Sequence, residues 1–63
     1  MDKKIMEERM RQLLALDQNS SDIYTKLAGF AQTQKMKDTL LALAADEKRH
    51  VKIENEILSL ILK

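Results

Sequence analysis

The sequence predicts an all-α protein, and three observations support this class. Its 63 residues include no proline and a single glycine, Gly29, so little interrupts a helix. Leu, Ala, Lys, Glu, Gln and Met, which all favour helices, dominate the composition. Apolar residues recur with the period of an amphipathic helix in two long segments.

The first segment predicts one amphipathic helix from about residue 3 to residue 31. With each residue turning ~100° about the axis, one face lies within about 60° of Asp17. That face comprises Met6, Met10, Leu13, Leu14, Asp17, Ser20, Ser21, Tyr24, Ala28 and Ala31. Charged residues such as Lys4, Glu8 and Lys26 lie on the opposite face.

The second segment predicts a helix from about residue 34 to residue 62, with Thr33 as its N-cap. The face centred on Glu47 comprises Met36, Leu40, Leu43, Ala44, Glu47, His50, Val51, Glu54, Leu58, Ile61 and Leu62. Gly29 weakens the end of the first helix. Because the connection is short, residues 1–63 are predicted to form one antiparallel helical hairpin.

A second interpretation divides the chain into three helices. Residues 17–22, Asp-Gln-Asn-Ser-Ser-Asp, favour a loop by local propensity. Against a loop, Leu13 before the segment and Tyr24 after it keep the same helical phase. The two-helix interpretation is therefore preferred.

The composition limits the functional classes. Without cysteine, disulfides and thiolate metal sites are excluded. A net charge of +1 and few aromatic residues argue against nucleic-acid binding. No apolar run approaches the ~20 residues of a membrane span, so a soluble cytoplasmic protein is expected. A chain this short often depends on a metal or a partner subunit for stability.

Glu47 and His50 are the most informative pair, because they project from one apolar face one helical turn apart. Asp17 is about as far from the turn at residues 32–33 as the midpoint of this pair. Equal residue counts from the turn mean equal heights in a hairpin, so the three side chains should meet. Two carboxylates and an imidazole favour iron or manganese, with zinc also compatible.

One hairpin cannot cover two wide apolar faces, so two copies are expected to pack into a four-helix bundle. A two-fold axis would gather four carboxylates and two imidazoles from Asp17, Glu47 and His50. Each buried carboxylate without a partner costs several kcal/mol, and two divalent cations would offset that cost.

The order of these residues resembles half of a ferritin-like di-iron bundle, as in rubrerythrins and encapsulated ferritins. Asp17 is followed by Tyr24, and Glu47-Lys48-Arg49-His50 matches the family's Glu-x-x-His. The resemblance implies a homodimer with two irons at its interface and ferroxidase activity. It implies Glu47 as bridging ligand, Asp17 as terminal ligand, His50 as nitrogen ligand and Tyr24 beside the site.

The chain departs from the family at Asp17, where Glu is usual, and this departure leaves the oxidase activity open. The sequence also shows no counterpart of the C-terminal extension that takes encapsulated ferritins into a shell, so encapsulation is not inferred. Glu54 has two interpretations, an additional metal ligand or a partner of Arg11 across the interface at the same height, and the pair with Arg11 is favoured. The alternative function is a helical oligomerisation module without a working metal site.

Overall fold

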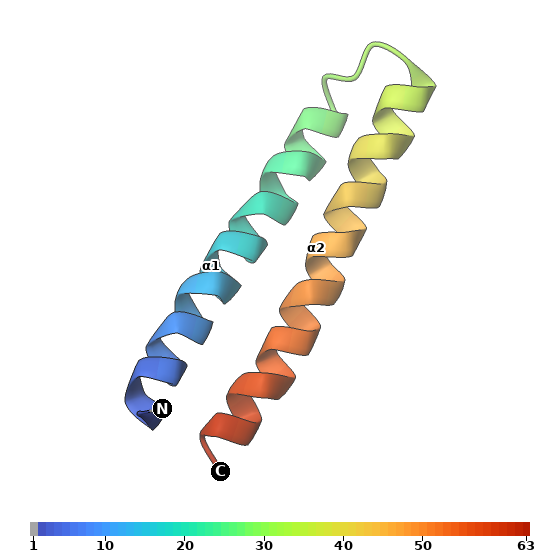
Figure 1. Cartoon of the computed structure of the whole chain (residues 1–63). Coiled ribbons are helices and arrows are strands. Elements are labelled where there is room, and N and C mark those ends of the chain that lie inside the picture. Colours follow the sequence, from blue (N-terminus) through green and yellow to red (C-terminus); the bar gives the residue numbers. More distant parts are fainter. Residues whose placement is uncertain (1) are drawn as a thin grey trace.

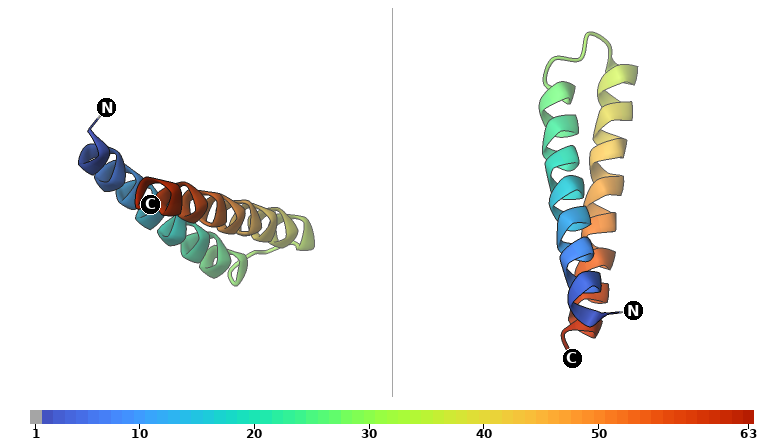
Figure 2. Two further views of the ribbon diagram at one scale, coloured as in Figure 1. Left: turned by 90° about the horizontal axis from the view of Figure 1, so that it is seen from below. Right: turned by 60° about the vertical axis from the view of Figure 1, so that its left-hand side comes forward.

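The computed structural model describes residues 2–63, and Met1 lies outside the described residues. Two long helices, α1 (Lys3–Ala28) and α2 (Gln34–Ile61), lie side by side and run in opposite directions (Figures 1 and 2). The hairpin measures 47 × 14 × 13 Å, with both chain ends opposite the loop (Figure 1). Residues 2–63 contain no strand, which confirms the predicted all-α hairpin.

Both helices begin at the kind of side chain that satisfies free backbone N–H groups. The Asp2 carboxylate accepts a hydrogen bond of 2.9 Å from the backbone N–H of Lys4. The hydroxyl of Thr33 accepts one of 3.1 Å from the backbone N–H of Met36. Thr33 is therefore the N-cap that the sequence predicts.

Helix α1 ends at Ala28, three residues before the expected end at Ala31. The backbone N–H groups of Gly29, Phe30 and Ala31 bond to the carbonyls three residues earlier, at 3.0–3.2 Å. These shorter-range bonds tighten the last turn and satisfy carbonyls at the helix end. Helix α2 ends at Ile61, within the usual scatter about the expected residue 62.

The segment from Asp17 to Asp22 is continuous helix, so the three-helix interpretation is wrong. Ser21 is 3% exposed, and its hydroxyl donates a 3.2 Å hydrogen bond to the backbone carbonyl of Ala44 on α2. Thr25 donates to the carbonyl of Ser21 at 2.9 Å. The hydrogen bond from Ser21 to α2 thus helps to hold as helix a segment whose local propensity favours a loop.

Three columns of residues, each with a spacing of seven, form the inward side of the hairpin. Such a spacing keeps residues on one helix face. The inner column, which faces the other helix, comprises Leu14, Ser21 and Ala28 with Ala44, Val51 and Leu58. The middle column comprises Met10, Asp17, Tyr24 and Ala31 with Leu40, Glu47, Glu54 and Ile61. The outer column comprises Met6, Leu13, Ser20 and Leu27 with Met36, Leu43, His50 and Ile57.

Burial falls steadily from the inner to the outer column. Four of the five buried residues described belong to the inner column: Ser21, Ala28, Ala44 and Leu58. Small side chains at this contact let the two helices approach closely. Middle-column residues are mostly half-buried, whereas every apolar residue of the outer column is at least 36% exposed. A single hairpin therefore buries its inner column and leaves the apolar side chains of its outer column exposed.

Within residues 2–63, neither helix has a segment that is both long and apolar enough to cross a membrane.

Candidate metal centre

Asp17, Glu47 and His50 form a cluster at the middle of the hairpin. Each offers one ligand atom, and these three atoms lie within 4.8 Å of one another. Asp17 comes from α1 and the other two from α2. They meet because Asp17 and the Glu47–His50 pair are equally far from the loop, so the two helices bring them to one level.

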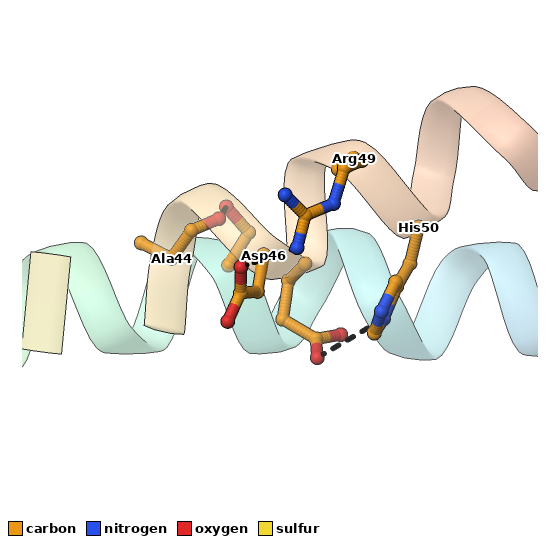
Figure 3. Close-up of polar contacts among 6 residues, drawn as sticks. Ala44, Asp46, Arg49 and His50 are labelled. Carbon is orange, nitrogen blue, oxygen red and sulfur yellow. Dashed lines mark hydrogen bonds and ion pairs between the residues drawn. The ribbon is translucent and has the colours of Figure 1, made fainter. Parts of the chain in front are cut away.

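Glu47 and His50 are already in contact on α2. The Nδ1 atom of His50 lies 3.5 Å from Oε1 of Glu47 (Figure 3). The side chain of Glu47 is 20% exposed and that of His50 is 50% exposed. Glu47 thus lies toward α1, whereas the imidazole reaches the outer column and is open to whatever covers that side.

Sequence reasoning placed Glu54 near the site but missed its burial. Glu54 is 8% exposed, and its Oε1 atom has no hydrogen-bond partner. Burial, then a hydrogen bond to Asp17 and the negative charge of Asp17, raise the pKa of Glu54 from 4.5 to about 7. Glu47 raises this pKa further, and His50 opposes the shift.

Among residues 2–63 of one chain, Glu54 does not contact Arg11, and the pair predicted across the interface stays a prediction. Arg11 instead bonds to Glu7 on its own helix, with Nε 2.9 Å from the carboxylate. The height argument considered only positions along the helix axes. Side chains lean toward the N-terminus of their helix, so Glu54 leans toward the loop and Asp17 leans away from it. The two carboxyl groups therefore converge, and within one chain the neighbour of Glu54 on α1 is Asp17.

Tyr24 lies two turns from Asp17 in the middle column, on the loop side, and is half-buried. Its lean toward the N-terminus of α1 points the ring in the direction of Asp17. The Cα atoms of these residues are ~10 Å apart along the axis, so Tyr24 borders the cluster rather than belonging to it. Asp46, next to Glu47, bonds to Arg49 at 2.7 Å (Figure 3).

A groove of about 360 Å³ is lined by Gln18, Ser21, Asp22, Lys48 and Val51. None of the cluster residues lines it. By helical phase, Gln18 and Lys48 project on the opposite side of the hairpin from the outer column. The groove and the cluster are therefore separate features.

The residues present suit a hard divalent cation. Two carboxylates and one imidazole converge, and carboxylate and imidazole donors are those of iron and manganese sites. Beside them lies a buried carboxyl oxygen that nothing in the chain satisfies, which is uncommon in folded proteins. No family model, curated protein or solved structure matches the chain.

Proposed function

We propose that this chain is a ferritin-like metal-binding protein that holds two iron ions, or two manganese ions, per homodimer. One observation carries the proposal: the ligand atoms of Asp17, Glu47 and His50, from two different helices, lie within 4.8 Å of one another. The resemblance of their order along the sequence to ferritin-like proteins supports the same function.

Asp17, Glu47 and His50 would have different roles in holding the metals. Glu47, the less exposed of the two cluster residues on α2, would bridge the two metals, as the resemblance implies. Asp17 and His50 complete each end with one oxygen and one nitrogen. When bound, iron supplies the redox chemistry by which ferrous ions are oxidised with dioxygen or peroxide. The protein fixes the geometry and leaves coordination positions open.

A second copy of the chain is the expected partner, because the outer column is apolar and uncovered. The apolar residues on either side of His50 along that column, Leu43 and Ile57, are 40% and 36% exposed. A regular spacing of seven is typical of helices that pack against another helix. His50 interrupts the apolar column at its centre, so a second hairpin seated there would reach the imidazole.

The position of the cluster also favours two copies related by a two-fold axis. Asp17 lies near the middle of α1, and Glu47 and His50 lie near the middle of α2. A two-fold axis at this level brings the two clusters together while the hairpins overlap along their whole length. The four carboxylates of Asp17 and Glu47 then balance two divalent charges, which offsets the cost of burying them.

The test compares metal content and ferrous oxidation in the full chain and in the double variant Glu47→Ala, His50→Ala. We expect one iron per chain in the wild type, oxidation of added ferrous iron, and loss of both in the double variant. Glu56→Ala is the matched control, since Glu56 is an exposed carboxylate on the same helix. Equal metal binding by wild type and double variant would contradict the proposal.

A second candidate function is a helical oligomerisation module without a working metal site. The exposed outer column favours it, because that surface calls for a partner whether or not metal binds. Asp17, one methylene shorter than the usual glutamate, is consistent with it. A ligand that binds only the folded state raises the melting temperature, so this alternative predicts no change when iron or manganese is added.

A further inference from the structure

Glu54 is a buried acidic side chain with an unused oxygen. It is 8% exposed, and Oε1 has no hydrogen-bond partner among residues 2–63. A carboxyl group removed from water without a full set of partners is unfavourable, and such groups are rare in folded proteins. The position therefore calls for a partner that the polypeptide itself does not supply.

The Glu54 carboxyl group lies near the cluster, although it is outside the set of ligand atoms of Asp17, Glu47 and His50 that lie within 4.8 Å of one another. Glu54 follows His50 by four residues and Glu47 by seven, so all three share one side of α2. Asp17 on α1 is near enough to the Glu54 carboxyl group to raise its pKa, and Glu47 and His50 on α2 act on the same pKa in opposite directions. The lean of α2 side chains toward its N-terminus directs Glu54 toward the cluster.

We propose that Glu54 is a fourth protein ligand of the metal centre, and that its oxygen makes the site select six-coordinate cations such as Mn²⁺ and Fe²⁺ over Zn²⁺. This inference rests on the proposed function. It adds a ligand and a basis for metal choice that Asp17, Glu47 and His50 alone do not provide.

The selectivity follows from ligand number. With Asp17 and His50 from one chain and a bridging Glu47 from each chain, every metal has four protein ligands, the number found in the tetrahedral sites that Zn²⁺ accepts readily. In raw affinity Zn²⁺ exceeds Mn²⁺ and Fe²⁺, so a protein favours the latter two through geometry and ligand type. Glu54 adds a fifth protein ligand at each metal and raises the carboxylates to three in each chain. That set is crowded for a four-coordinate ion and suitable for a six-coordinate one.

The experiment titrates the metal-free full chain with Mn²⁺, Zn²⁺ and Co²⁺ and compares wild type with Glu54→Gln. The amide keeps the shape of the side chain, so the variant should fold, which circular dichroism verifies. We expect Mn²⁺ affinity to fall at least about tenfold, the loss typical even of residues that only support a ligand. Zn²⁺ affinity should change much less. The visible absorption of bound Co²⁺ should intensify, because Co²⁺ absorbs more strongly as its coordination number falls.

Two further variants make the result specific. Glu56→Gln removes an exposed carboxylate from the same helix and should leave all three titrations unchanged. Glu54→Asp keeps a carboxylate that is one methylene shorter and should recover part of the Mn²⁺ affinity. If Glu54→Asp is no better than Glu54→Gln, the carboxylate is not the ligand and the inference fails.

The outcomes separate this inference from the proposed function. Wild type that binds metal, with Glu54→Gln binding Mn²⁺ equally well, overturns the role of Glu54 alone. Equal losses for Mn²⁺ and Zn²⁺ with an unchanged Co²⁺ spectrum assign Glu54 a positioning role and also overturn it. Wild type that binds none of the three metals overturns the proposed function together with this inference.

Discussion

The carboxyl group of Glu54 on α2 lies against that of Asp17 on α1, at the centre of the hairpin. Two carboxyl groups this close repel each other when both are ionised, which, together with burial, raises the pKa of Glu54 to about 7. The proximity of Asp17 and Glu54 thus destabilises the folded hairpin at neutral pH, where ionisation of Glu54 brings two negative charges together. It also marks the place where a cation would be most stabilising.

The first prediction is that the metal-free chain loses stability as pH rises from 4.5 to about 7, the range set by Glu54. The pKa of Glu54 is 4.5 when unfolded and about 7 when folded, so in this range the unfolded chain has released a proton that the folded chain keeps. Stability then falls with rising pH. Thermal melts at fixed protein concentration, with a chelator present, measure the change.

Glu54→Gln should remove most of this dependence, because an amide does not titrate. Glu56→Gln should leave the wild-type slope unchanged, since Glu56 is exposed on the outward side of α2. The same slope in wild type and Glu54→Gln would show that another group is responsible.

The second prediction is that Asp17→Asn lowers the pKa of Glu54. Asp17 contributes two of the causes that raise this pKa, the hydrogen bond and the negative charge, whereas burial remains in the variant. The pKa should therefore fall from about 7 toward 4.5. Carbon-13 NMR of the Glu54 side-chain carboxyl measures it directly. Asp22→Asn, an exposed change on the same helix, is the control and should leave the Glu54 titration as it is.

The sequence predicted the meeting of Asp17 with Glu47 and His50, because equal distance from the loop is a property of backbone geometry alone. It did not predict the contact between Asp17 and Glu54. That contact depends on the lean of side chains along each helix, which can shift a meeting point by about one turn. The end of α1 was also missed, since Gly29 and Phe30 could have continued the helix and only the tightened last turn stops it.

Propensity misled at residues 17–22 for a related reason. Asp, Asn and Ser favour loops because their side chains compete for backbone hydrogen bonds. Ser21 instead bonds across to Ala44, and it can do so only when α2 is in place. Residue propensities describe one segment at a time, so they do not predict a hydrogen bond between two helices. The helical phase that Leu13 and Tyr24 keep across the segment was the better guide, because it reflects packing against the partner helix.

The third prediction concerns this bond. Ser21→Ala should destabilise the hairpin by ~0.5–1.5 kcal/mol, the usual net contribution of one hydrogen bond. Ser59→Ala is the matched control, because Ser59 is exposed and its hydroxyl bonds at 3.0 Å to Asn55 on its own helix. Both changes gain the same helix propensity, so the difference in urea midpoint isolates the contact between helices. Equal effects would contradict the structural role of Ser21.

The fourth prediction tests the outer column as the surface that receives a second copy. Leu43 and Leu41 are equally exposed, at 40% and 41%. Two residues apart, they project on nearly opposite sides of α2, and only Leu43 shares the side of His50. A two-fold interface contains each position twice. If a buried leucine contributes ~1.5 kcal/mol, Leu43→Lys weakens the dimer by ~3 kcal/mol, about 100-fold in Kd.

Analytical ultracentrifugation should then show monomers for Leu43→Lys and dimers for Leu41→Lys. The reverse result would place the partner on the opposite side of the hairpin, where it could not reach the imidazole.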